Sequence, residues 1–289
     1  MLAFVFPGQG SQHRGMGQRL FDEVPAYAAA EREVDALLGY SLRQLCLQDP
    51  DNRLKQTQYT QPALYVVNAL HYYQAIAHGE APTHVSGHSL GEYNALLAAG
   101  AFDFITGLRL VKQRGELLAQ AKDGGMAAVV GLSSTRIPQL LQENGLGAID
   151  VANYNSPLQI VLSGPLAELQ RAGPIFEKAG AKLFMPLQVS AAFHSRYVAN
   201  AARLFGDFLE TISFKPLQLP VIANVTAEPY PQNDAAAVRL LLVKQITHPV
   251  RWSRSVRHLM ALGVSTFKEI GPGNVLARLV QQIQQEPDG

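Results

Sequence analysis

Residues 87–91 (GHSLG) form the segment of the sequence with the clearest potential for chemistry. They match the G-x-S-x-G pattern, in which a serine lies on a tight turn between a strand and a helix and projects its hydroxyl outward. Glycines on both sides of Ser89 leave room for the strained turn, and the N–H groups at the helix start can stabilise an oxyanion. Ser89 and Glu92 also fit the S-x-x-E capping box of an ordinary helix. The motif alone leaves both interpretations open.

A nucleophilic serine requires a general base, and the sequence has eight histidines. His88 is poorly placed, because the side chain of an immediate neighbour on a turn points away from the serine hydroxyl. His194, within residues 191–195 (AAFHS), lies where an apolar strand ends and a helix begins. This is also a predicted domain junction, at which a cleft is expected. A histidine that only caps or packs at the junction is the alternative.

Arg114 is a charged residue on an apolar helix face. Leu108, Val111 and Leu118 form the apolar stripe, and Arg114 follows Val111 by three residues and precedes Leu118 by four. A buried guanidinium requires an anionic partner, and its planar fork suits a carboxylate. That partner is a substrate or an acidic side chain elsewhere, unless the arginine reaches the surface.

The middle of the chain has the pattern of a small domain with the order βαββαβ, the ferredoxin-like order. Ser133 and Ser134 are expected to cap its first helix. The predicted elements are a strand at 126–132, a helix to about Asn144, strands at 148–153 and 158–163, a helix at 165–179 and a strand at 181–189. Gly124-Gly125 and a polar turn at Ser190 bound this domain. Residues 126–189 are therefore predicted to be inserted into one discontinuous domain of residues 1–125 and 190–289.

The larger domain is predicted to be an α/β core with a parallel sheet, because short apolar strands alternate with longer helical patterns. The candidate strands are 2–6, 84–87, 219–224 and 266–270. The polar residues from Gln281 onward are expected to fray.

Composition excludes several classes of function. Hydrophobic residues make up 47% of the 289 residues and charged residues 16%, as in a globular protein that buries a core. Lys and Arg total 24 against 23 Asp and Glu, so no overall field attracts nucleic acid or an anionic membrane. Cys46 is the single cysteine, which excludes an internal disulfide and favours a reducing, cytoplasmic setting. The apolar run 2–6 ends at Pro7 and is not expected to be a signal peptide, and no stretch approaches the roughly 18 residues of a membrane span.

Taken together, these residues resemble the malonyl-CoA:acyl-carrier-protein acyltransferases over nearly the whole chain. The matching segments, in the family's order, are residues 6–12 (FPGQGSQ), 60–64 (TQPAL), 87–92 (GHSLGE), 112–115 (KQRG), 193–195 (FHS) and 271–273 (GPG). The resemblance implies an α/β-hydrolase-like core that carries a ferredoxin-like small domain.

The resemblance also implies roles for individual residues. Ser89 matches the nucleophile and His194 its general base. In this family a backbone carbonyl orients the imidazole in place of an aspartate, and the matching position is Gln245. The backbone N–H groups of Gln9 and Leu90 match the oxyanion hole.

The acyl pocket is implied in the same way. Arg114 matches the arginine that pairs with the malonyl carboxylate, and Gln61 and His88 are assigned to the same substrate site. Phe193 precedes the histidine, as it tends to do in related polyketide enzymes that use malonyl instead of methylmalonyl units. Ala191 departs from that motif, since a histidine often stands there.

The implied reaction proceeds through a malonyl-serine ester and needs no metal and no bound cofactor. Malonyl-CoA is the donor, and the phosphopantetheine thiol of an acyl carrier protein is the acceptor. The enzyme is expected to be a monomer. Carrier proteins are usually acidic, so a local basic surface is expected, with an ordinary solvated face as the alternative. The candidates are Arg251, Arg254, Arg257 and His258, and separately Arg196.

Four alternatives stay open. A hydrolase uses the same serine and histidine, although family members that clear uncharged acyl groups typically lack the arginine at position 114. A scaffold that only binds carrier protein would tolerate loss of Ser89 or His194, and both are present. The polyketide and fatty-acid enzymes share all these residues, and segments 59–70 and 191–194 look more like the trans-acting polyketide type. A domain of a larger polypeptide is also possible.

Overall fold

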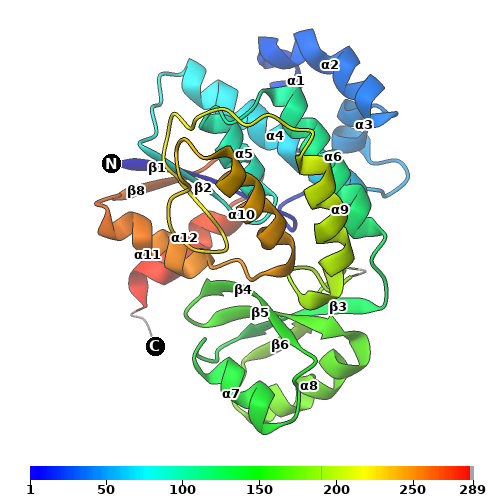
Figure 1. Ribbon diagram of the computed structural model, residues 1–289, viewed down its shortest axis with the longest axis vertical. Helices are drawn as coiled ribbons and strands as arrows, with labels where there is room; N and C mark the ends of the chain where they lie inside the picture. The colour runs from blue at the N-terminus through cyan, green and yellow to red at the C-terminus, as the bar shows by residue number, and fades with distance from the viewer. Residues whose placement is uncertain (190, 287–289) are drawn as a thin grey trace.

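The computed structural model describes residues 1–189 and 191–286, whose strands form two separate four-stranded sheets (Figure 1). One sheet is parallel, with the order β7-β2-β1-β8, and the other is antiparallel, with the order β4-β5-β3-β6. The strands are β1 (Leu2–Phe6), β2 (His84–Gly87), β3 (Gly124–Val130), β4 (Asp150–Ser156), β5 (Gln159–Pro165), β6 (Leu183–Pro186), β7 (Val221–Ile222) and β8 (Thr266–Glu269).

Helices cover both faces of the parallel sheet. On β1, Phe4 and Phe6 contact Tyr72 of α4, whereas Val5 packs with α11 and α12 on the opposite face, as alternation along a strand requires. The helices are α1 (Leu20–Glu23), α2 (Pro25–Leu38), α3 (Leu42–Gln48), α4 (Thr57–Ala77), α5 (Gly91–Ala98), α6 (Phe104–Ala119), α7 (Arg136–Glu143), α8 (Leu166–Lys178), α9 (Ala199–Leu209), α10 (Ala235–Thr247), α11 (Trp252–Ala261) and α12 (Val275–Gln285), with a short 3₁₀ helix at Arg196–Val198. Within residues 1–189 and 191–286, none of the helices is both long and apolar enough to cross a membrane.

The antiparallel sheet has its helices on one face only. Ala127 and Val129 of β3 share a core with α7 and α8, and these elements lie at the lower end of the molecule in Figure 1. Met126 and Ala128 alternate with them and line a cavity against the rest of the protein. The elements follow in the order strand, helix, strand, strand, helix, strand, as predicted.

Some boundaries differ from the prediction. Strand β3 begins at Gly124, so the Gly124-Gly125 pair is already bonded to β5 instead of preceding the sheet. Ser133 and Ser134 do not cap α7, which begins at Arg136, because the hydroxyl of Ser133 contacts Thr135 instead. The turn predicted at Ser190 lies outside the described residues.

The expected fraying from Gln281 is wrong for the described part of that segment. Helix α12 continues to Gln285, because Ile283 is buried together with Leu279 and Val280 against α11. These positions form an apolar stripe at helical spacing among the polar glutamines, and burial of the stripe stabilises the last turns.

Backbone hydrogen bonds join the small sheet to the core. Val250 N–H donates to the carbonyl of Ala152 at 2.9 Å, and Tyr154 N–H donates to the carbonyl of Val250 at 2.9 Å. Asn153 thus forms a parallel bridge with Val250. Through this bridge the segment after α10, which is distant in the sequence, pairs with β4. The wall that the small sheet contributes to the cavity is therefore fixed to the core by main-chain bonds.

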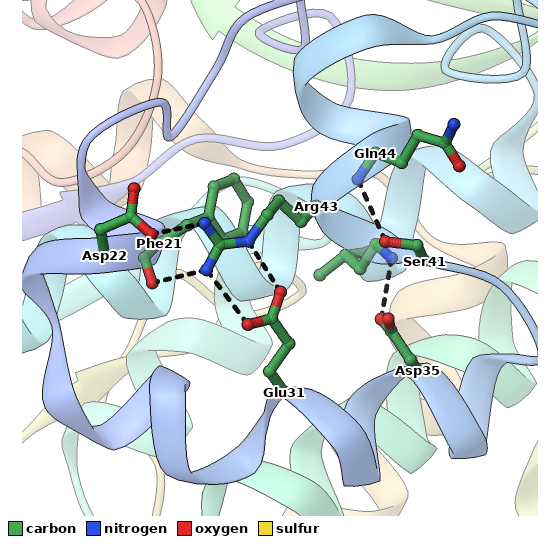
Figure 2. A network of polar contacts seen from close by, with 8 residues as sticks. Phe21, Asp22, Glu31, Asp35, Ser41, Arg43 and Gln44 are labelled. Carbon is green, nitrogen blue, oxygen red and sulfur yellow. Dashed lines mark hydrogen bonds and ion pairs between the residues drawn. The ribbon is translucent and has the colours of Figure 1, made fainter.

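Arg43 holds the first three helices together (Figure 2). Its guanidinium donates to Glu31 at 2.7 and 3.1 Å, to Asp22 at 2.5 Å and to the carbonyl of Phe21 at 3.1 Å. It also lies over the ring of Phe21, 5.5 Å from its centroid. One planar side chain from α3 thereby bonds residues of both α1 and α2.

Arg43→Ala is expected to reduce the free energy of unfolding by about 1–3 kcal/mol, because it leaves Glu31 and a main-chain carbonyl without their donors. Arg32→Ala is the matched control, since Arg32 is an exposed arginine of α2 and its loss should cost less than about 0.5 kcal/mol. Urea unfolding of both variants measures the difference. Equal losses in the two variants would contradict this account of Arg43.

Candidate active site

Ser89 lies on the turn between β2 and α5 with a positive φ of 51°. The turn requires glycine on both sides: a Cβ on Gly87 would lie 2.0 Å from the carbonyl group of Gly91, and one on Gly91 would lie 2.0 Å from the carbonyl oxygen of Phe6. Asn224 bonds both ends of the turn, accepting from Ser89 N–H at 2.7 Å and donating to the Gly87 carbonyl at 2.6 Å. Close packing and this clamp hold the strained serine in place.

The capping-box interpretation of this segment is wrong. Helix α5 begins at Gly91, with Leu90 at the N-cap position and no side-chain cap bond. The carboxylate of Glu92 turns away from Ser89 N–H and accepts hydrogen bonds from distant segments of the chain. The Ser89 hydroxyl is therefore not used for capping.

His194 meets the Ser89 hydroxyl. Its Nε2 lies 2.8 Å from Ser89 Oγ, and its Nδ1 lies 2.8 Å from the main-chain carbonyl oxygen of Gln245. A carbonyl oxygen only accepts, so Nδ1 carries the proton and Nε2 is left to accept from the serine. His194 also has a positive φ, 55°, so both partners of this hydrogen bond lie on strained backbone.

The environment of His194 keeps its imidazole neutral. Burial, followed by the nearby charge of Arg114, lowers the pKa of His194 to about 3, whereas its bond to the Gln245 carbonyl acts in the opposite direction. A neutral imidazole with a free Nε2 lone pair can accept the proton of Ser89.

Two main-chain N–H groups beside Ser89 have no acceptor among residues 1–189 and 191–286. Gln9 and Leu90 both line the cavity, and within the described residues neither N–H donates a hydrogen bond. The loops that carry them are in close contact, because a Cβ on Gly8 would lie 2.4 Å from the carbonyl oxygen of His88. This pair of donors can stabilise an oxyanion formed at Ser89.

Arg114 is buried, 3% exposed, and its guanidinium reaches the same hydroxyl. It donates to Ser89 Oγ at 3.2 Å, to Gln61 Oε1 at 2.7 Å and to Gln245 Oε1 at 2.9 Å. It also lies over the ring of Tyr93, 5.6 Å from its centroid. Across residues 1–189 and 191–286 no carboxylate forms an ion pair with it. The structural ion pair considered from the sequence is thus absent from the described chain.

The remaining predicted residues also lie at this cavity, which measures about 280 Å³. Gln61 faces Arg114, with its own amide nitrogen bonded to Thr57. Phe193 is mostly buried in the wall next to His194. His88 is a wall residue whose Nε2 lies 2.8 Å from Asn155 Oδ1, so it does not contact the serine hydroxyl.

Several site residues were missed from the sequence. Asn153 and Asn155 of β4 line the cavity from the small sheet, and Asn224 and Glu92 support the serine turn from behind. Each has an ordinary local sequence context. What these residues share is a polar side chain at a buried position of an apolar element. For Arg114 the surrounding apolar stripe makes such a position recognisable in the sequence, whereas the neighbours of these residues do not.

Several basic side chains that were predicted to bind an acidic partner already contact groups within the protein. Arg254 and His258 both contact Glu228, at 3.3 and 3.1 Å. Arg196 forms an ion pair with an aspartate of β4, and Arg257 donates to a main-chain carbonyl beyond α12. Their charges are therefore less available than the sequence indicated.

Comparison with known proteins gives a consistent result. The family model described as "Acyl transferase domain" matches residues 3–288. The polyketide biosynthesis malonyl CoA-acyl carrier protein transacylase BaeC of Bacillus velezensis is 50% identical over 100% of this chain and 98% of its own. The malonyl CoA-acyl carrier protein transacylase of Synechocystis sp. is 40% identical over 97% and 92%. The polyketide biosynthesis protein PksE of Bacillus subtilis is 50% identical, but the chain spans only 37% of its length.

Solved structures have the same fold. A malonyl CoA-acyl carrier protein transacylase from Burkholderia pseudomallei has a TM-score of 0.94 at 46% identity, over 100% of this chain and 99% of that one. A complex described as a type II PKS acyl-carrier protein with its malonyl-transacylase has a TM-score of 0.92 at 38% identity, over 98% and 93%. With a family model that matches almost its entire length and full-length relatives at this identity, the chain belongs to the acyl transferase domain family.

Proposed function

We propose that this protein transfers the malonyl group of malonyl-CoA to the phosphopantetheine thiol of an acyl carrier protein through a malonyl-Ser89 ester. The position of Arg114 carries the proposal. One methylene separates the ester carbonyl of a malonyl-serine from its carboxylate, so the carboxylate must lie close to Ser89. The guanidinium donates to Ser89 Oγ at 3.2 Å and is otherwise held by neutral acceptors, so its charge is available to that carboxylate.

The first half of the reaction loads Ser89. His194 Nε2 takes the hydroxyl proton as Oγ attacks the thioester carbonyl, and the N–H groups of Gln9 and Leu90 receive the developing oxyanion. When the carbon–sulfur bond breaks, the imidazolium returns its proton to the departing CoA thiolate. The main-chain carbonyl of Gln245 stabilises the imidazolium in between.

The second half repeats these steps in reverse. The carrier's thiol gives its proton to His194 and attacks the ester, and the Ser89 oxygen leaves with that proton. Donor and acceptor thiols use the same cavity in turn, so the kinetics are ping-pong. The proposed chemistry uses no metal and no bound cofactor.

The finer description of the fold is part of the proposal. The parallel sheet, with its serine turn at the end of β2, supports an α/β-hydrolase-like core of residues 1–125 and 190–289. The βαββαβ order, with both helices on one face, supports an inserted ferredoxin-like domain of residues 126–189. Pairing of Gly124 in β3 moves the first boundary two residues earlier.

We propose the trans-acting polyketide role over the equivalent fatty-acid role. Identity is 50% to BaeC, a polyketide biosynthesis protein, and 40% to the Synechocystis transacylase, whose name specifies no polyketide role. The structural relative in complex with an acyl carrier protein supports the proposed partner. A cytoplasmic monomer remains our expectation.

Intact-mass measurement tests the function. The protein is incubated in turn with malonyl-CoA, acetyl-CoA and methylmalonyl-CoA, with and without a phosphopantetheinylated carrier protein. The expected result is a malonyl adduct that disappears as malonyl-carrier forms. No malonyl adduct on the wild type rejects the proposal, and release to water in preference to carrier identifies a hydrolase.

The pH profile of acylation is expected to be flat from about pH 8 down to about pH 5. Only neutral imidazole accepts the serine proton, and the pKa of His194 lies near 3, so protonation removes the base only at still lower pH. Quenched-flow mass spectrometry with acetyl-CoA isolates this base, because acetyl has no carboxylate for Arg114. Circular dichroism at each pH confirms that the protein is folded. Half-loss of rate near pH 6.5, the ordinary histidine value, would contradict the prediction.

A further inference from the structure

Glu92 is a buried carboxylate that takes no part in the proposed chemistry. It is 1% exposed, and its two oxygens accept three hydrogen bonds. Oε1 accepts from Asn224 N–H at 3.0 Å and from the Tyr230 hydroxyl at 2.6 Å, and Oε2 accepts from Gln245 Nε2 at 2.5 Å. In the described part of the chain it forms no ion pair. Burial of the carboxyl group raises the pKa of Glu92 to about 7, whereas its three hydrogen bonds favour the ionised form.

The contact of Glu92 with Gln245, together with the main-chain carbonyl of Ser89, determines which end of that amide faces the active site. Gln245 Nε2 donates both to Glu92 and to the main-chain carbonyl of Ser89, the latter at 2.8 Å. The main-chain carbonyl of Ser89 only accepts, and so does the Glu92 carboxylate in its ionised form, so the amide nitrogen faces both of them. The amide oxygen is then left facing Arg114, to which it lies at 2.9 Å.

This arrangement holds Arg114 without neutralising it. Gln61 on one side and Gln245 on the other present amide oxygens, and the Glu92 carboxyl group lies one residue further away. A carboxylate bonded directly to Arg114 would compete with an incoming substrate carboxylate. An amide oxygen orients the guanidinium and leaves its charge for the ligand.

We propose that Glu92 is a positioning residue for the selection of carboxylated acyl groups, which it accomplishes by fixing the Gln245 amide so that Arg114 is aimed at Ser89. This inference rests on the proposed function and deepens it. Glu92 touches neither substrate nor reacting atoms in this scheme.

Glu92→Gln is the direct test, because an amide cannot accept on both of its ends. Asn224 N–H is a fixed main-chain donor, so the new amide oxygen faces it and the new NH₂ faces the NH₂ of Gln245. Rotation of the Gln245 amide relieves this contact, but it breaks the hydrogen bond to the Ser89 carbonyl and presents the amide nitrogen to Arg114. We expect kcat/KM for malonyl-CoA to fall about tenfold or more, and that for acetyl-CoA to change less than about threefold.

Tyr230→Phe is the matched control. It removes a hydrogen bond of comparable length from the same carboxylate but on Oε1, and leaves Oε2 and Gln245 in contact. Gln245→Met removes the amide and keeps the main-chain carbonyl that bonds His194, so it should reproduce the effect of Glu92→Gln. The malonyl-to-acetyl ratio of kcat/KM is measured for each variant, together with its thermal unfolding.

A lowered ratio in Glu92→Gln and Gln245→Met, with a wild-type ratio in Tyr230→Phe, supports the proposal. An equal loss of ratio in all three variants, or an unchanged ratio in Gln245→Met, overturns it. If Glu92→Gln does not fold, Gln245→Met and Tyr230→Phe decide the question. Absence of a malonyl adduct on the wild type would instead reject the proposed function itself.

Discussion

Ser89→Ala will abolish the covalent malonyl adduct and reduce malonyl transfer on the order of 10³-fold or more, since removing the nucleophile removes the two-step pathway. The hydroxyl is the atom on which His194, at 2.8 Å, and Arg114, at 3.2 Å, converge, and no other described group occupies that position. Intact mass after incubation with malonyl-CoA measures the adduct. CoA release in the presence of holo carrier protein measures transfer.

Ser86→Ala is the control for this substitution. Ser86 lies on β2 three residues before the nucleophile, is fully buried, and its hydroxyl has no hydrogen-bond partner among the described residues. Its loss should leave both the adduct and the transfer rate near wild type. A malonyl adduct that persists in Ser89→Ala would show that another residue carries the acyl group and would end the proposed mechanism.

Arg114→Ala will reverse the preference between malonyl and acetyl donors. A lost pair between a buried guanidinium and a carboxylate costs about 2–5 kcal/mol, which is about 30-fold or more in kcat/KM for malonyl-CoA. Acetyl-CoA has no carboxylate to lose, so its loading should be unchanged or faster. Steady-state kinetics with the two donors give the ratio directly.

Acetyl-CoA serves as the internal control in that experiment, because it reports whether Ser89 and His194 still function without the arginine. Arg114→Lys adds a second control: the charge is kept, but the planar fork that reaches Gln61, Ser89 and Gln245 is lost. Its malonyl loading should be intermediate. Unchanged malonyl loading in Arg114→Ala would remove the carboxylate-recognition argument.

The sequence predicted the parts of the site that carry a recognisable local pattern. Ser89 stands in a glycine-flanked motif, and Arg114 breaks an apolar helical stripe. The partners of these residues come from segments far along the chain. His194 was a candidate base from its place at the predicted domain junction, with a packing role as the alternative, whereas Gln245 was placed only by the resemblance to a family. The structure brings all four within hydrogen-bond distance of at least one other member.

Glu92 and Asn224 show what the sequence could not predict. Glu92 fitted a local capping box, and that interpretation fails because tertiary donors from Asn224, Tyr230 and Gln245 capture its carboxylate. Asn224 ends a predicted strand and gives no sign that its amide will clamp a turn formed by residues 87–89. Contacts of this range depend on topology, which no local pattern encodes.

Element types were predicted better than element ends. The βαββαβ succession of elements in the middle of the chain, and strands such as Leu2–Phe6, follow from apolar periodicity. The ends depend on single contacts: Thr135 precedes α7 in place of the predicted serine cap, and the last turns of α12 persist because Ile283 is buried. The fraying predicted from Gln281 onward rested on composition alone. It was wrong because burial of one apolar residue, Ile283, outweighs the polarity of the glutamines around it.

The main-chain pairing of Val250 with Ala152 and Tyr154 has a consequence for how the cavity can be redesigned. Two peptide hydrogen bonds join the wall of the small sheet to the core, so widening the cavity by rotating the sheet would break both. The wall is thus preorganised. Binding of an acyl group therefore does not have to offset the entropic cost of ordering a loosely attached domain. Capacity for bulkier acyl groups is then governed by the volumes of individual wall side chains such as Phe193 and Met126. Substitutions there, and not changes to the way the two sheets are joined, are the productive route to altered acyl scope.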